Sequence, residues 1–359
     1  MYESTSNTNS ADQQVRIENF IGYTKVPVGA TPPLTIHGVH QKKRVKAPLA
    51  TTEATLVASC SRGVKVFEVC GGISARAYEE QISRSPVFVL SSTKLTLEFA
   101  DWIEEHFTEL KKIAESTTNH GKLIKIQPYI FARSVHLEFT YTTSDAAGQN
   151  IVTIATQKVC DELLTNKTLN SRFVFEKSYV EGNTTAEKKL SLMRSFTTRG
   201  VKVRSWGIVN KDACLKYLNV HPRDIYRLYI EAMQSSIRTS TLGMNINSTN
   251  ILAAMYLSCG QDAGSIAESS WSQLSMDIDD DDNLHMSLYF PSLLVGTVGG
   301  GTQYSDQSKH LKMLDCLGVD RKMAFAETVA SFCLALELST IAAVSNNTFA
   351  KAHKTLARL

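Results

Sequence analysis

The sequence has almost no excess charge of either sign. Its 359 residues include 38 Lys and Arg against 35 Asp and Glu, which gives a formal net charge of +3. Such a balance offers no global attraction to nucleic acid or to an anionic membrane. Apolar residues at 43% and charged residues at 20% are ordinary for a folded domain, so the composition excludes a disordered, collagen-like or coiled-coil chain.

The sequence also lacks any regular cysteine spacing. Its seven cysteines are scattered and include no C-x-x-C pair. An odd, scattered set argues against a disulfide framework and against a zinc site. We therefore expect buried free thiols, a reducing compartment and no bound metal.

No stretch has the length and apolarity of a membrane span. The most apolar one, residues 329–344, contains Glu337 and is shorter than the about 20 residues that a span needs, so it predicts a buried helix. Residues 1–15 are polar and predict a flexible tail that is neither a secretory signal nor an anchor. These features predict a soluble, cytoplasmic protein.

The hydrophobic pattern of residues 85–177 predicts a compact module. The expected elements are a strand at 85–90, a helix at 93–116, strands at 123–131 and 135–141, a helix at 150–164 and a strand at 172–177. This order is typical of the ferredoxin-like β-α-β-β-α-β module. We predict an α+β protein in which a large mixed α/β domain, residues 16–84 and 178–359, carries this module as an insert.

Other segments of the large domain have simpler interpretations. Helices are expected at 11–20 and 51–62, and Gly63 is expected to end the second. The basic stretch 36–46 is interpreted as a solvated loop or strand edge. The acidic run 277–282 is interpreted as a solvated turn, because cation sites need a fixed ligand spacing that it lacks.

Four residues outside the module could carry chemistry. Glu53 lies among small and apolar residues, where burial would raise the pKa of a carboxyl toward that of a general acid. Lys188 lies in a polar loop and could stabilise an anion. Asp262 follows an apolar run, and His353 lies near the carboxyl terminus. Each also has an ordinary explanation, since exposed acids, surface lysines, helix caps and exposed terminal histidines are common.

Two segments rich in small residues could approach a ligand closely. Residues 296–302, GTVGGGT, contain three consecutive glycines but match neither G-x-G-x-x-G nor a P-loop. Residues 144–150, SDAAGQN, precede the second helix of the module. Backbone amides at the start of a helix suit a pyrophosphate.

Seven motifs, taken together and in order, resemble the catalytic portion of the 3-hydroxy-3-methylglutaryl-coenzyme A (HMG-CoA) reductase family. They are ENFIGY (18–23), ATTEA with VASCSRG (50–63), DAAGQN (145–150), EGNTTAEKK (181–189), CGQDA (259–263), GTVGGGT (296–302) and His353. The resemblance covers about residues 16–357, and the motif spellings resemble the eukaryotic, class I type.

The resemblance implies a reaction and four catalytic roles. The family reduces a thioester to an alcohol through a hemithioacetal and an aldehyde, here HMG-CoA to mevalonate and coenzyme A for isoprenoid and sterol biosynthesis. Lys188 would stabilise the oxyanion, and Glu53 would be the general acid. Asp262 would couple the two, and His353 would protonate the departing thiolate. The cofactor would be NADPH or NADH, with no metal.

The resemblance also implies binding residues and an assembly. Substrate and coenzyme A would be held by Ser59, Arg62, Lys65, Arg84, Asn183, Lys189 and Asn250. The nicotinamide cofactor would be held by Asp145, Ala146, Gly148, Gln149, Asn150, Gly299, Gly300, Gly301 and Thr302, with the module at 85–177 as its binding domain. A homodimer or tetramer is implied, with active sites at an interface near residues 18–23.

Departures from the family pattern leave alternatives open. Glu181 and Glu187 stand where the family has Ser and Asp, whereas Arg84 matches an arginine that binds the substrate carboxylate. A family lysine on that carboxylate has no clear counterpart within 230–240. These changes would disfavour an acyl group with a free carboxylate by roughly 1–3 kcal/mol per contact. Residues 118–119 replace a Ser-Arg pair that grips the 2′-phosphate, so the choice between NADPH and NADH stays open.

Two further functions are therefore alternatives. One is a divergent paralogue that reduces a different acyl thioester in specialised metabolism. The other is a non-catalytic binding protein of the same fold. The second is disfavoured because all four candidate catalytic residues are present: Glu53, Lys188, Asp262 and His353.

Overall fold

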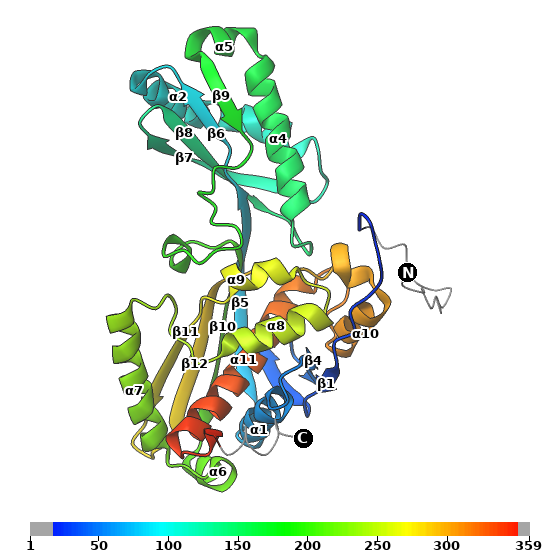
Figure 1. The fold of residues 1–359 in the computed structure, drawn as a ribbon, viewed down its shortest axis with the longest axis vertical. Helices are drawn as coiled ribbons and strands as arrows, with labels where there is room; N and C mark the ends of the chain where they lie inside the picture. Colours follow the sequence, from blue (N-terminus) through cyan, green and yellow to red (C-terminus); the bar gives the residue numbers. More distant parts are fainter. Residues whose placement is uncertain (1–16, 351–359) are drawn as a thin grey trace.

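The computed structural model describes residues 17–350, which form two bodies linked through one long strand (Figure 1). Each body has its own hydrophobic core. The predicted tail at 1–15 and His353 lie outside the described residues, as does most of the helix expected at 11–20. Residues 17–20 of that expected helix form a turn instead.

The smaller body follows the predicted order of strands and helices. Its elements are β6 (Val87–Leu90), α2 (Thr93–Glu105), α3 (Phe107–Glu115), β7 (Lys122–Phe131), β8 (Ser134–Thr142), α4 (Gln149–Thr165), α5 (Lys167–Phe173) and β9 (Phe175–Tyr179). The strands pair antiparallel in the order β9-β6-β8-β7. Aromatic rings fill the core between sheet and helices, with Phe99 5.4 Å from Phe88 and 5.1 Å from Phe173.

Two elements of this body differ from the sequence prediction. The helix expected at 93–116 is divided at His106, whose ring stacks on Trp102 and whose Nδ1 lies 2.8 Å from the Trp102 carbonyl oxygen. The strand expected at 172–177 begins only at Phe175. Asn166 caps a short preceding helix, α5, with its side chain, and this helix takes up the first residues of the expected strand.

The strand β5 (Ile73–Arg84) connects the two bodies. Residues 74–81 pair with β10 (Gly200–Val209) in the large sheet, and residues 82–84 pair with β8 in the small one. Twelve residues of strand extend about 40 Å. The strand therefore carries Arg84, its last residue, to the junction of the bodies.

The larger body contains a mixed sheet, a separate two-stranded sheet formed by residues 28–30 and 48–50, and helices that pack on them. Its other strands are β1 (Val28–Ala30), β2 (Leu34–Gly38), β3 (Arg44–Val45), β4 (Pro48–Ala50), β11 (Gln273–Ile278) and β12 (Leu284–Leu293). Its helices are α1 (Leu56–Val69), α6 (Lys211–Ala213), α7 (Pro222–Thr239), α8 (Ser248–Ser258), α9 (Ile266–Ser269), α10 (Ser305–Met313) and α11 (Lys322–Ser345). Short helical turns are η1 (Met193–Ser195), η2 (Cys214–Leu218), η3 (Ala263–Ser265) and η4 (Gly300–Gln303).

Helix α11 is the centre of the large core. The buried helix predicted at 329–344 is confirmed, since every residue from Lys322 to Ala343 except Met323 is buried. Helix α11 is longer than the apolar stretch 329–344, so its length and apolarity would suit a membrane span, contrary to the expectation from the sequence, but 89% of the apolar window is buried within the protein. In the described chain α11 is thus a core helix.

The helix predicted at 51–62 is present, but both of its predicted ends were wrong. Helix α1 begins at Leu56, five residues later than expected, and continues through Gly63 to Val69. A Cβ atom on Gly63 would overlap the carbonyl oxygen of Ala335. Gly63 therefore allows α1 and α11 to pack closely instead of ending a helix.

Candidate active site

Lys188 and Asp262 form an ion pair at the junction of the two bodies. The Lys188 ammonium lies 2.9 Å from Asp262 Oδ2, and both side chains are about half exposed. Asp262 follows α8 and caps η3, accepting from the Gly264 amide at 2.9 Å and from Ser265 Oγ at 3.3 Å. The structure thus brings together two residues that the sequence places 74 positions apart.

The loop that carries Lys188 has an unusual backbone. Asn183, Ala186 and Lys188 have φ values of 67°, 53° and 55°, in the left-handed region that non-glycine residues seldom adopt. Such strain persists only where surrounding contacts hold it, and it concentrates at functional sites. One such contact is the Lys188 amide, which donates to Glu268 Oε1 at 3.4 Å.

The pair is ionised at neutral pH. The hydrogen bond that Lys188 donates to Asp262 raises the pKa of the Lys188 ammonium. Partial burial alone would raise the pKa of the Asp262 carboxyl, but the hydrogen bonds from Lys188 and the Gly264 amide outweigh it and lower the pKa. A fixed, half-exposed ammonium can stabilise negative charge on a carbonyl oxygen.

A buried ionic network lies beneath this pair. Arg199 is buried and bonds the carboxylate of Glu268, and its Nη2 also donates to Gln149 Oε1 at 2.6 Å. Burial raises the pKa of Glu268 in spite of this partner. Through Gln149 the network reaches α4 of the smaller body. Neither Arg199 nor Glu268 was predicted from the sequence, because no local pattern marks them.

Arg84 is held by two acids of the lysine loop. Its Nη1 donates to Glu187 Oε2 at 2.8 Å and to Glu181 Oε2 at 3.2 Å, and its Nη2 donates to Thr153 Oγ1 at 2.8 Å. The cation predicted to bind a substrate carboxylate is therefore already paired with two carboxylates of the chain.

Glu53 lies elsewhere in the large body. Its Oε2 accepts from Asn250 Nδ2 at 2.9 Å, so these two predicted residues meet, and its Oε1 accepts from Thr55 Oγ1 at 3.0 Å. Glu53 is exposed in the loop before α1, so the expectation that it lies within a helix was wrong, whereas its ordinary explanation as an exposed acid fits the structure.

Helix α8 separates Glu53 from the ion pair. Asn250 lies in its first turn, and Asp262 lies four residues beyond its end. The helix rises about 12 Å from Asn250 to Ser258. Among the described residues, the bonded partners of Glu53 include neither Lys188 nor Asp262.

Three of the seven residues predicted to hold substrate or coenzyme A, Ser59, Arg62 and Lys65, lie on α1. Ser59 Oγ is 3.1 Å from Ser339 Oγ, and Arg62 donates to the Ser339 hydroxyl at 3.0 Å and carbonyl at 2.6 Å. Burial lowers the pKa of Arg62. Lys65, one turn further on, is exposed, with its ammonium 5.8 Å from the Tyr217 ring.

Two further predicted contacts belong to the lysine loop itself. The amide of Asn183 donates to Glu181 Oε1 at 2.6 Å, and its side chain is exposed. Lys189 is also exposed, and its ammonium donates to the Glu187 carbonyl oxygen at 3.2 Å. Both are therefore accessible to a ligand.

The two segments predicted to hold the cofactor lie side by side. Ala146 forms a bridge with Val298, and the Thr297 amide donates to the Asp145 carbonyl oxygen at 2.8 Å. Gly148 caps α4 with a φ of 93°. A Cβ at Gly299 or Gly300 would meet open space, so the backbone there is accessible. Gly301 packs instead on Gly260.

Other side chains of these segments have structural partners. The buried carboxylate of Asp145 accepts from the amides of Asp320 at 2.9 Å, Arg321 at 2.9 Å and Lys322 at 3.1 Å, which caps α11. Thr302 Oγ1 donates to the Gly299 carbonyl oxygen at 2.6 Å, and Asn150 is exposed. Asp145 therefore anchors the turn and Gln149 is engaged by Arg199, whereas Asn150 remains accessible to a ligand.

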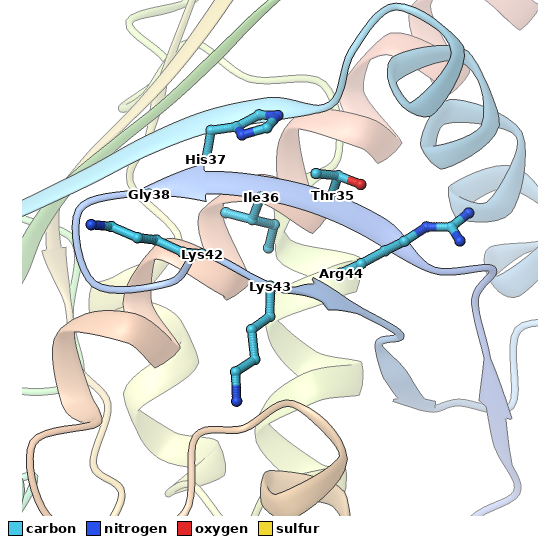
Figure 2. A pocket seen from close by; sticks show the side chains of 7 residues that line it. All are labelled: Thr35, Ile36, His37, Gly38, Lys42, Lys43 and Arg44. Carbon is cyan, nitrogen blue, oxygen red and sulfur yellow. The ribbon is translucent and has the colours of Figure 1, made fainter.

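A cavity of about 520 Å³ lies on the β2–β3 hairpin (Figure 2). Two of its cations have acidic partners: Lys43 pairs with Asp315 and Arg44 with Glu68, both at 2.7 Å. His37 Nε2 lies 2.8 Å from the Gly71 carbonyl oxygen. None of the lining residues comes from the lysine loop, α8 or the 145–150 turn, so this cavity is separate from the candidate site.

Comparison with known proteins identifies close relatives by sequence. The pattern of the hydroxymethylglutaryl-coenzyme A reductase family matches residues 2–358. The 3-hydroxy-3-methylglutaryl-coenzyme A reductase of Methanocaldococcus jannaschii is 37% identical over 345 residues, which cover 95% of this chain and 84% of the relative. Reductase 3 of Solanum tuberosum is 32% identical over 344 residues, covering 93% of this chain and 58% of the relative.

Solved structures agree with the predicted α+β fold class. The class II 3-hydroxy-3-methylglutaryl-CoA reductase of Streptococcus pneumoniae bound to NADPH superposes with a TM-score of 0.71 at 15% identity, covering 91% of this chain and 78% of that one. At this identity the match shows the fold alone. The class I subtype stays a prediction. The family match over nearly the whole chain, together with the sequence relatives, shows that the chain is an oxidoreductase of the hydroxymethylglutaryl-coenzyme A reductase family.

Proposed function

We propose that this chain reduces a coenzyme A thioester to an alcohol, with HMG-CoA as the first candidate substrate and mevalonate and coenzyme A as products. The observation that carries the proposal is the Lys188–Asp262 pair on a strained loop at the junction of the bodies. The names of the relatives, at 32% to 37% identity over most of the chain, support the same substrate.

Each candidate residue has a chemical part in this reaction. The Lys188 ammonium would bind the thioester oxygen and stabilise the charge that develops on it, while Asp262 orients the ammonium. Glu53 would supply a proton to that oxygen. His353 would protonate the departing thiolate.

The turn at 145–150 and Gly299–Gly300 suit a nicotinamide dinucleotide. The backbone at Gly299 and Gly300 borders open space, and the first amides of α4, a helix of 17 residues, suit a pyrophosphate. Bound NADPH or NADH would supply the hydride. We assign cofactor binding to residues 85–177 with the glycine segment, and substrate binding to residues 16–84 and 178–359.

A second copy of the chain would complete the site. Glu53 and the ion pair lie toward opposite ends of α8, so one chain does not join them. Leu192 and Phe196, which follow Lys188, and Ile21, in the first motif, are exposed apolar side chains that a partner would cover. We therefore propose a homodimer, or a tetramer of such dimers, in which Glu53 of one chain faces Lys188 of the other.

A stoichiometric assay tests this function. Purified protein is incubated with HMG-CoA and with NADPH or NADH in parallel, and free thiol and oxidised cofactor are measured. We expect two cofactors oxidised per thiol released, and the faster cofactor settles the preference. Absence of oxidation with HMG-CoA and with uncharged acyl thioesters would overturn the proposal in favour of a non-catalytic protein.

A further inference from the structure

The surroundings of Arg84 hold more negative than positive charge. Besides Arg84, they include Arg199, whose Nη2 lies 3.9 Å from Glu187 Oε2. The two guanidinium groups face the carboxylates of Glu181, Glu187 and Glu268, which leaves one negative charge in excess. Arg84 and Arg199 are 9% and 1% exposed in their side chains, so water screens this imbalance little.

The nearby lysines do not reverse this balance inside the cluster. Lys188 is paired with Asp262 at 2.9 Å. Lys189 is an exposed residue at the rim, where its ammonium bonds the Glu187 carbonyl oxygen. Solvent screens an exposed ammonium strongly. An acyl carboxylate that reached Arg84 would therefore meet the two glutamates first.

Glu181 is fixed in place by three contacts. Its Oε2 accepts from Arg84 Nη1 and from the Ser85 amide, both at 3.2 Å. Its Oε1 accepts from the Asn183 amide at 2.6 Å. A backbone bond of 2.7 Å from the Gly182 amide to the Ser85 carbonyl oxygen ties the loop to the end of β5. Glu181 thus occupies one edge of the guanidinium and is not free to leave.

Several buried polar atoms in the same cluster have no hydrogen-bond partner. Within residues 17–350, six of the seven buried side-chain polar atoms without a hydrogen-bond partner belong to Arg84, its chain neighbours and the residues linked to them. They are Ser83 Oγ, Arg84 Nε, Ser85 Oγ, Gln149 Nε2, Thr185 Oγ1 and Arg199 Nε. Buried polar groups are nearly always paired, so this concentration leaves hydrogen-bonding capacity for water or for neutral polar groups of a ligand.

We propose that Glu181 is a specificity-determining residue that occupies Arg84 in place of an acyl carboxylate. This inference rests on the proposed thioester reduction. It assigns to the site an uncharged, hydroxylated acyl group as a substrate at least as good as one with a terminal carboxylate. An acyl group with a terminal carboxylate has to displace a fixed carboxylate from a buried guanidinium, whereas one with a hydroxyl or methyl group does not.

The test compares two acyl thioesters in wild type and two variants. HMG-CoA carries the carboxylate, and 3-hydroxy-3-methylpentanoyl-CoA has a methyl group in its place. In wild type we expect kcat/KM for the uncharged thioester to equal or exceed that for HMG-CoA. Glu181→Gln and Glu181→Ser should raise kcat/KM for HMG-CoA at least tenfold, about 1.4 kcal/mol, and leave the uncharged thioester within about threefold.

The ratio of the two substrates separates specificity from damage to the loop. A disturbed loop lowers both rates together, so a ratio that stays at its wild-type value overturns the inference. Glu176→Gln is the matched control, because Glu176 pairs with Arg133 on the exposed surface of β9 and should change neither rate. If wild type reduces neither thioester, the proposed function fails. The inference is then decided by calorimetric Kd values, since Glu181→Gln should tighten HMG-CoA alone by at least tenfold.

Discussion

The core around α11 and the junction around Lys188 both contain buried ionisable side chains, but these side chains have different hydrogen-bond partners in the two regions. In the core, Glu327 accepts from the His40, Gln41 and Ala77 amides, and Glu337 accepts from the Ile246 and Asn247 amides. Each is a single, fully buried carboxylate held chiefly by backbone.

At the junction, charges are paired side chain to side chain. Arg84, Arg199 and Lys188 each bond at least one acid there, and several polar atoms remain unpartnered. Backbone donors fix a carboxylate in one position, whereas side chains can exchange partners with a ligand. We infer that the core carboxyl groups stabilise the fold through their hydrogen bonds to backbone amides, and we propose that the charges at the junction act on ligands.

The largest effect should come from Lys188 at the junction. Lys188→Ala removes the ammonium that would stabilise the oxyanion, and we expect kcat to fall by about 10³-fold, or 4 kcal/mol. Because the side chain is half exposed, the unfolding temperature should stay near that of wild type. The measurements are cofactor oxidation and thermal unfolding. If Lys188→Ala instead lowers the unfolding temperature and keeps the wild-type kcat, Lys188 serves the fold, and the distinction between core and junction is refuted.

The reverse result is expected for Glu337 in the core. Glu337→Ala leaves the amides of Ile246 and Asn247 and the Ser248 hydroxyl without their acceptor, and it should lower the free energy of unfolding by about 3 kcal/mol. Urea unfolding measures this loss. Glu98→Ala, on the surface of α2, is the control and should shift stability by less than about 0.5 kcal/mol. Equal losses in both variants would contradict the assignment of a core role.

Asp145 shares features of both regions: it lies at the junction, but backbone amides hold its carboxylate as they hold those in the core. Asp145→Ala removes the cap of α11 and should lower stability by about 1–2 kcal/mol. It also releases the turn proposed to bind the cofactor, so KM for NADPH or NADH should rise more than KM for the thioester. Asp306→Ala, in the exposed first turn of α10, is the control. If KM for the cofactor is unchanged, Asp145 stabilises the fold but does not support cofactor binding.

The smallest effect concerns pH. Burial raises the pKa of Glu337 above its ordinary value of 4.5, so the folded state retains a proton that the unfolded state releases. This group therefore contributes a stability that declines as pH rises from 4.5 toward the folded pKa. Glu337→Gln should show a decline that is shallower by up to about 1.4 kcal/mol per pH unit. Urea unfolding between these pH values checks it, and parallel curves for the two proteins would refute it.

Local patterns in the sequence determined much of this protein. The strand and helix order of the smaller body follows from hydrophobic periods of two and about 3.6 residues, which depend only on near neighbours. The burial of α11 follows from its composition. The motifs around Lys188 and Asp262 marked two residues that the fold then placed 2.9 Å apart.

Only the tertiary structure decided what these residues contact. Gly63 looks like a helix end in the sequence, but in the structure it allows α11 to pack closely on α1. Glu53 was expected within a helix, but α1 begins only at Leu56. Asp145 caps a helix more than 170 residues away, and Arg84 meets acids about 100 residues away. Such partners come from chain segments brought together by burial of separate apolar faces. The period of a single helix or strand therefore cannot encode them.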